Sequence, residues 1–105
     1  MDEHNQRVLD KACMDNVDSD INHSVTWYIL ASYAYDNDDQ LLSKGRYERL
    51  AKLMLNNWDE IEHKNKDYIS EDDLRGKTYK GEYPKRTELS LRHLQEVYFG
   101  RQKHT

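Results

Sequence analysis

Residues 43–63, SKGRYERLAKLMLNNWDEIEH, carry the most regular pattern in the chain. Large apolar side chains recur there at steps of three and four residues, which lays one wide apolar stripe along a helix. These side chains are Tyr47, Leu50, Ala51, Met54, Leu55, Trp58 and Ile61. Ser43 suits the N-cap position because its hydroxyl can accept a hydrogen bond from a free backbone N–H of the first turn. The pattern therefore predicts a core helix over residues 43–63.

A second helix is predicted directly before it, over residues 19–35. The segment SDINHSVTWYILASYAY is apolar around most of a helical circumference, so we expect it to be the most buried element. The run DNVDSD, residues 15–20, is rich in capping residues and indicates where that helix starts. A polar turn at residues 36–39 ends it. Two helices joined by so short a link are expected to pack antiparallel, as a helical hairpin.

The C-terminal part of the chain predicts one short helix and one long helix. Ser70 and Asp73 have the spacing of a capping box, which indicates a short helix over residues 71–75 that is closed by Gly76. Residues 87–99 carry a further apolar stripe at helical spacing and predict a third long helix.

The remaining segments are polar. Residues 76–84 are expected to form an ordered loop or short hairpin, with the rings of Tyr79 and Tyr83 folded back onto the core. Residues 1–14 allow a short N-terminal helix with a weak apolar face. Both this segment and residues 100–105 are expected to fray.

Together these elements predict an all-α fold: an antiparallel helical hairpin closed by a third long helix, with a short N-terminal helix and an ordered polar loop. A chain of 105 residues is large enough for one core, so we expect residues 1–105 to form a single small helical domain. Only 36% of the residues are apolar. Tyrosine and tryptophan side chains must therefore supply much of the core area.

The only cysteine is Cys13, which excludes an internal disulfide and a cysteine-based metal site. We expect a buried small residue or an inert thiol there, as suits a reducing cytoplasm. No apolar run approaches the length of a membrane span, and the polar N-terminus does not resemble a signal peptide. The expectation is a soluble cytoplasmic protein that does not bind a membrane.

The charge of the chain is unevenly distributed. Residues 1–63 carry a net charge of −7 and residues 64–105 carry +3. In the second part, cations alternate with tyrosines, an arrangement that suits phosphate contacts and base stacking, and equally suits a protein partner. This predicted nucleic-acid or partner-binding set is Arg75, Lys77, Tyr79, Lys80, Tyr83, Lys85 and Arg86. Because the overall charge is −4, avid binding to nucleic acid is disfavoured and a protein partner is the stronger expectation.

Two acid-x-x-His pairs place a carboxylate and an imidazole on one helix face. They are Asp20 with His23 and Glu60 with His63. In an antiparallel hairpin the two pairs would converge, as in dinuclear metal sites of helical bundles. Those sites need further bridging glutamates, which the sequence does not offer. We therefore predict solvated helix ends and no metal.

The passage Tyr33–Leu55, YAYDNDDQLLSKGRYERLAKLML, resembles the small N-terminal helical subdomain of NAD-dependent DNA ligases. In that family the subdomain carries an Asp-x-x-Tyr-Asp run at the start of a helix and binds the nicotinamide mononucleotide (NMN) half of NAD. The run over residues 61–94 is similar to short phage-encoded ligase-like proteins. The resemblance implies a nicotinamide-type ligand around Tyr35, Tyr47 and Glu48.

The chain departs from that motif where the ligand would be held. Tyr47 matches the tyrosine of the motif, but Lys44 stands in place of the first Asp and Glu48 in place of the second. A lysine beside a cationic nicotinamide ring repels it. Residues 1–105 also hold no Lys-x-Asp-Gly motif and no nucleotidyltransferase domain, so the chain cannot ligate DNA by itself.

The leading hypothesis is therefore a small non-enzymatic accessory protein, phage-encoded as the resemblance implies, that binds a host or phage protein. It would act in the host cytoplasm, in nucleic-acid metabolism. One alternative is a DNA ligase remnant that binds a nicotinamide nucleotide, NMN or NAD. Another is a weak DNA- or RNA-binding module that uses the basic C-terminal half. No cofactor is predicted.

Overall fold

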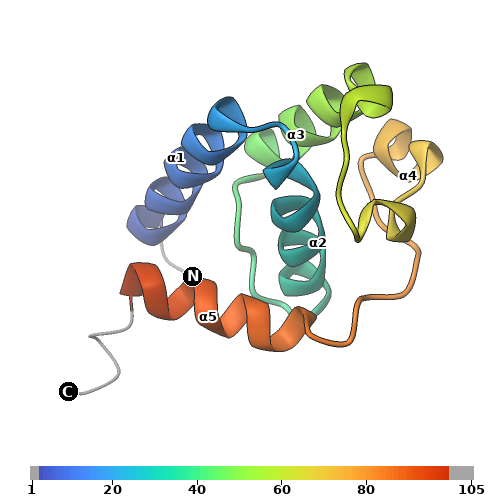
Figure 1. The fold of residues 1–105 in the computed structure, drawn as a ribbon. Coiled ribbons are helices and arrows are strands. Elements are labelled where there is room, and N and C mark those ends of the chain that lie inside the picture. Colours follow the sequence, from blue (N-terminus) through green and yellow to red (C-terminus); the bar gives the residue numbers. More distant parts are fainter. Residues whose placement is uncertain (1–2, 100–105) are drawn as a thin grey trace.

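A computed structural model describes residues 3–99, which fold into helices joined by turns and loops (Figure 1). The helices are α1 (Glu3–Ser19), α2 (His23–Asp36), α3 (Lys44–Asn56), α4 (Glu71–Gly76) and α5 (Thr87–Phe99), with 3₁₀ turns at Trp58–Glu60 and Lys66–Tyr68. The described part of the chain contains no strand, which confirms the predicted all-α class. The fraying expected for residues 100–105 lies outside the described residues.

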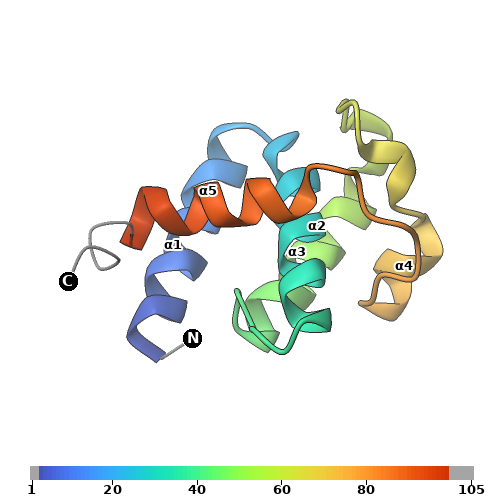
Figure 2. The same cartoon turned by 90° about the horizontal axis from the view of Figure 1, so that it is seen from below.

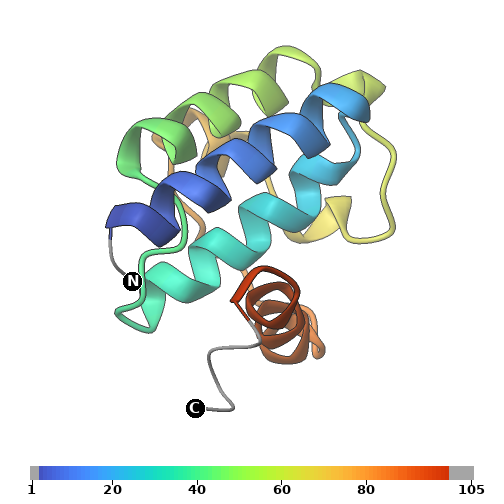
Figure 3. The ribbon, with the colours of Figure 1, turned by 90° about the vertical axis from the view of Figure 1, so that its left-hand side faces the viewer.

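Helix α2 is the centre of the arrangement, since it packs against α1, α3 and α5. Figure 3 shows α1, α2 and α3 alongside one another, with the chain reversing direction from each helix to the next. Helix α5 crosses beneath α2, and α4 packs against α3 on the far side (Figures 1 and 2). None of the helices in residues 3–99 combines the length and the apolar character that crossing a membrane requires.

The core follows from the apolar character of α2. Nine of its fourteen residues are buried, as its sequence predicts for the most buried element. Helix α3 adds the face formed by Leu50, Ala51 and Met54. Ser43 caps α3 as predicted, because its side chain accepts a hydrogen bond from the Arg46 N–H at 3.2 Å.

The N-terminal helix is longer and better packed than the short, fraying helix predicted over residues 1–14. Helix α1 has 17 residues and buries Leu9, Ala12, Cys13 and Val17 against the core. The capping residues at 15–20 therefore lie mostly inside α1 instead of starting α2, which begins at His23. Leu9, Cys13 and Val17 are spaced four residues apart, so three positions suffice to form a narrow buried stripe on an otherwise polar helix.

The predicted helix over residues 43–63 ends early, at Asn56. The Asn57 side-chain amide donates to the Leu53 carbonyl at 2.9 Å and so caps the last turn. The chain then forms a 3₁₀ turn, and Ile61 is buried from outside the helix. The apolar spacing continues past residue 56 because Trp58 and Ile61 still pack on the core, although their backbone is no longer α-helical.

The capping box of α4 is confirmed: the Ser70 hydroxyl accepts from the Asp73 N–H at 3.1 Å, and the Asp73 carboxylate accepts from the Ser70 N–H at 3.4 Å. The helix includes Gly76, and the left-handed residue that ends it is Lys77, with φ of 53°. The loop that follows is ordered without forming a hairpin of strands. Tyr79 is buried and Tyr83 packs on the core, as predicted.

Candidate ligand pocket

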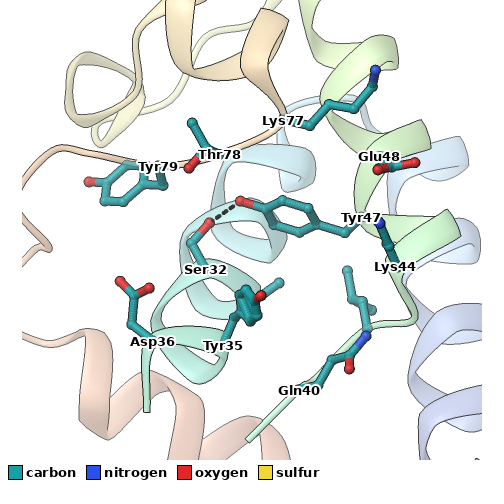
Figure 4. Close-up of a pocket in the computed structure, with 12 residues that line it drawn as sticks. Ser32, Tyr35, Asp36, Gln40, Lys44, Tyr47, Glu48, Lys77, Thr78 and Tyr79 are labelled. Carbon is teal, nitrogen blue, oxygen red and sulfur yellow. Dashed lines mark hydrogen bonds between the residues drawn. The ribbon is translucent and has the colours of Figure 1, made fainter. Parts of the chain in front are cut away.

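A pocket of about 350 Å³ opens beside the N-terminus of α3 (Figure 4). Its walls come from three parts of the chain: the C-terminal half of α2, the link into α3 with the first turns of that helix, and residues 77–79 after α4. The side chains on which its chemistry depends are Tyr35, Gln40, Lys44, Tyr47, Glu48 and Lys77.

Tyr47 forms a fixed aromatic wall of the pocket. One face of its ring is stacked on the Tyr28 ring, with centroids 4.8 Å apart and planes within 14° of parallel. Its hydroxyl lies 2.6 Å from the Ser32 hydroxyl, the contact dashed in Figure 4. Ser32 donates its single proton to the Tyr28 carbonyl at 2.8 Å, so Tyr47 is the donor to Ser32. Burial raises the pKa of Tyr47, which keeps the ring neutral.

Tyr35 contributes a second ring at the mouth of the pocket, and its side chain is 67% exposed. A tyrosine ring this exposed on a pocket wall offers a π-face to a ligand. Its neighbour Asp36 accepts a hydrogen bond from the Tyr83 hydroxyl at 2.5 Å, which ties the loop after α4 to the end of α2.

Three charged side chains, Lys44, Glu48 and Lys77, lie along one edge of the pocket (Figure 4). Lys44 is the first residue of α3 and Glu48 follows one turn later. Within residues 3–99 none of the three takes part in an ion pair. Two cations and one anion therefore face solvent at this edge with their charges available to a ligand.

The wall formed by residues 77–79 is held in place by tyrosines. The Tyr28 hydroxyl donates to the Thr78 carbonyl at 2.5 Å. The Tyr79 hydroxyl donates to the Glu82 carbonyl, and the Tyr79 ring contacts that of Tyr83 with centroids 4.8 Å apart. Burial raises the pKa of Tyr79 to about 12, so its hydroxyl keeps its proton at neutral pH. The pocket is therefore bounded on this side by an anchored loop.

The structure brings together the three residues predicted around a nicotinamide-type ligand, because Tyr35, Tyr47 and Glu48 all line this pocket. Lys44, noted in the sequence only as a departure from the motif, lies on the same pocket. Ser32, Gln40 and Thr78 were missed. No sequence signal marks them, because they come from separate segments that meet only in the fold.

The predicted nucleic-acid or partner-binding set is divided by the structure. Lys77 and Tyr79 line the pocket. Arg75 pairs with Asp72 at 2.9 Å and with Glu71 at 3.5 Å. Lys80, Lys85 and Arg86 are exposed outside the pocket. Neither tyrosine of the set offers a free face for base stacking, because Tyr79 is buried and the Tyr83 ring packs against those of Tyr33 and Tyr79.

The N-terminal end of α2 lies next to the segment that follows α3. The two acid-x-x-His pairs need this arrangement if they are to converge. The Glu62 N–H donates to the Asn22 side chain at 2.7 Å, and His63 Nε2 lies 3.2 Å from the Thr26 hydroxyl. His63 Nδ1 accepts from the Asn65 N–H at 3.0 Å, so both ring nitrogens have protein partners. Across residues 3–99 no three His, Cys, Asp or Glu side chains gather around a position for a metal ion, and Asp20, His23, Glu60 and His63 are no exception.

No protein-family model, curated protein or solved structure matches the chain. The pocket is therefore interpreted from its own residues.

Proposed function

We propose that this protein is a small non-enzymatic binding protein whose pocket holds a flat aromatic ligand of the nicotinamide type. The observation that carries the proposal is the convergence of Tyr35, Tyr47 and Glu48 on one pocket. These are the residues that the resemblance to the NMN-binding subdomain of NAD-dependent DNA ligases singles out in the sequence.

The dimensions and walls of the pocket suit such a ligand. A volume of about 350 Å³ lies at the small end of ligand pockets, which suits a molecule of one ring and one sugar. The Tyr35 ring and the outer face of Tyr47 offer stacking surfaces, and each aromatic contact contributes about 0.5–1.5 kcal/mol. For a cationic pyridinium ring these tyrosines add cation–π attraction, and the Glu48 carboxylate offsets the charge of Lys44.

The test is titration calorimetry with NMN on the wild-type chain and on Tyr35→Ala. Tyr35 is exposed, so its removal leaves the core intact, and we expect the affinity for NMN to fall about tenfold, equivalent to about 1.4 kcal/mol. Tyr68→Ala is the matched control, because Tyr68 is an exposed tyrosine that does not line the pocket. Absence of heat and of a thermal shift at millimolar NMN would refute the proposal.

A second candidate function, binding to a protein partner, is favoured by the outer face of α5. Leu89 and Val97 are each 63% exposed and lie eight residues apart, which places them on the same side of the helix. A partner that covered this face of the helix would remove the apolar area of both side chains from water, which favours binding. This role fits the accessory protein expected from the sequence.

The second candidate is tested by capture from a bacterial lysate, with and without nuclease, comparing the wild-type chain with the double variant Leu89→Glu and Val97→Glu. A protein retained by the wild type in both arms and lost by the variant supports it. Recovery that nuclease abolishes contradicts it and indicates nucleic-acid binding instead.

A further inference from the structure

Two lysines reach the same edge of the pocket from elements far apart in the chain. Lys44 opens α3, and Lys77 is the residue directly after α4. Both are exposed, both line the pocket, and within the described chain neither is engaged in an ion pair. Lysine ammonium groups are strong point-charge partners for phosphate. A pair of them on one pocket edge therefore suits an anionic group of the ligand.

The backbone at Lys77 fixes the point from which its side chain reaches the pocket edge. Its φ of 53° is left-handed, a conformation that disfavours every residue with a Cβ and that glycine adopts freely. Gly76 stands one position earlier, yet the left-handed position is occupied by a lysine. A left-handed residue commonly ends a helix, and here the Lys77 N–H donates to the Leu74 carbonyl at 3.2 Å and the Thr78 N–H to the Asp73 carbonyl at 2.9 Å. The turn sets the Lys77 side chain at the pocket edge, next to the anchored Thr78.

The groups along this edge match the parts of a sugar phosphate. Glu48 supplies carboxylate oxygens, which accept hydrogen bonds from the hydroxyls of a ribose. Lys44 and Lys77 supply donors and positive charge for a phosphate. Asp36, the remaining charged residue of the lining, is engaged by the Tyr83 hydroxyl. In Figure 4 the Lys77 side chain extends outward from the pocket, which places the phosphate at the mouth and the ring further in.

We infer that the pocket contains a phosphate subsite formed by Lys44 and Lys77, which makes it selective for phosphorylated ligands, that is, mononucleotides over the corresponding nucleosides. This inference rests on the proposed function of the pocket and adds to it the two residues that determine specificity. It also gives Lys44 a role: a lysine that repels a cationic ring when adjacent to it attracts the phosphate of the same molecule.

The experiment measures the affinities of matched pairs by titration calorimetry: NMN against nicotinamide riboside, and adenosine monophosphate against adenosine. The wild-type chain is expected to bind the phosphorylated member of a pair at least about tenfold more tightly at low salt, and the preference should shrink as salt screens the lysines. In Lys44→Gln with Lys77→Gln the two members should bind within about twofold of each other, since the subsite charge is gone.

Two further variants make the result specific. Lys52→Gln removes an exposed lysine of α3 that does not line the pocket, and it should leave the preference unchanged. Lys77→Gly removes the charge while relieving the left-handed strain, so it should unfold at a higher temperature than the wild type and still lose part of the preference. This outcome separates loss of the subsite from loss of the fold.

The same measurements distinguish a failure of the phosphate subsite from a failure of the proposed function. If both members of each pair bind equally to the wild type and Tyr35→Ala weakens both, the phosphate subsite is refuted and the proposed function stands. A preference for the phosphorylated member that survives both lysine substitutions also refutes the subsite. If no member of either pair binds at millimolar concentration, the proposed function itself fails.

Discussion

His63 illustrates how single side chains tie distant segments together. Its Nδ1 atom accepts from the Asn65 N–H at 3.0 Å, so the ring proton resides on Nε2, which donates to the Thr26 hydroxyl at 3.2 Å. Protonation of Nδ1 would break the bond to Asn65. Burial, together with the nearby charges of Lys64 and His23, lowers the pKa of His63 below its usual value.

This shift has a definite sign for stability. An unfolded histidine takes up its proton near pH 6.5, before the folded one does, so the free energy of unfolding is highest above that pH and falls as the pH drops towards the folded pKa. We expect the melting temperature of the wild type to fall more between pH 7.5 and pH 5.5 than that of His63→Gln, which cannot titrate. Parallel pH profiles for the two proteins would contradict this.

Cys13 is predicted to be chemically inert while the protein is folded. Its side chain is 1% exposed, and burial raises its pKa to about 12. At pH 8 the thiolate fraction is then on the order of a thousandfold lower than for a free thiol of pKa about 8.5. The reaction with a colorimetric disulfide reagent should therefore be slower in buffer than in concentrated urea by a similar factor. Equal rates in the two solvents would show that the thiol is accessible.

Among the elements, α1 differs most from the helix that the sequence predicted. It is joined to the pocket region, because the Asp10 carboxylate accepts from the Ser43 N–H at 2.9 Å, at the N-cap of α3. We expect Leu9→Ala to lower the free energy of unfolding by about 2–5 kcal/mol, since Leu9 is fully buried. Urea unfolding measures the effect. Met14→Ala, on the exposed side of the same helix, is the control and should cost less than about 1 kcal/mol.

A frayed α1 would make Leu9→Ala and Met14→Ala equivalent, and that result would contradict its place in the core. The expectation of fraying arose because the apolar face of residues 1–14 is weak. The residues that α1 buries form only a narrow stripe, which consists of Leu9, Ala12, Cys13 and Val17. Their contribution depends on the surface of α2 that covers them, which no local pattern reveals.

The elements that the sequence predicts correctly are those with local signals. The α4 capping box is formed by residues three apart, and α5 covers the predicted residues 87–99. The early end of α3 was not predicted because the apolar spacing continues through Trp58 and Ile61. The Asn57 side chain ends the helix by donating to the Leu53 carbonyl, and the sequence alone does not show that this hydrogen bond forms. Capping motifs between neighbouring residues can be predicted from the sequence. Where a helix ends, when a capping residue lies within a continuing apolar pattern, depends on tertiary packing.

At the scale of the whole molecule, the pocket exists because three segments meet. Tyr28 connects them: its ring stacks on Tyr47 of α3, and its hydroxyl holds the carbonyl of Thr78 in the loop after α4. The resemblance to the ligase subdomain singles out Tyr35, Tyr47 and Glu48, and all three line the pocket. The contribution of Lys77 and Thr78 was not predictable, since it depends on how the loop returns to α2.

The same tertiary contacts direct two tyrosines of the basic C-terminal half away from solvent. Burial of Tyr79 and the packing of Tyr83 direct two of its aromatic rings inward. Of the cations in this region, Lys77 lines the pocket and Arg75 is paired with acids of α4. A run of alternating charges and rings in the sequence is thus divided between the core and the surface.

The most direct test is a two-dimensional ¹H–¹⁵N spectrum of the labelled protein titrated with NMN. The pocket predicts saturable shifts of amide signals from Tyr35, from Lys44–Glu48 and from residues 77–79, with the outer part of α5 unchanged. Loss of these shifts in Tyr35→Ala would confirm the ring contact. A spectrum that stays unchanged at millimolar NMN, or shifts confined to α5, would contradict a ligand site at the start of α3.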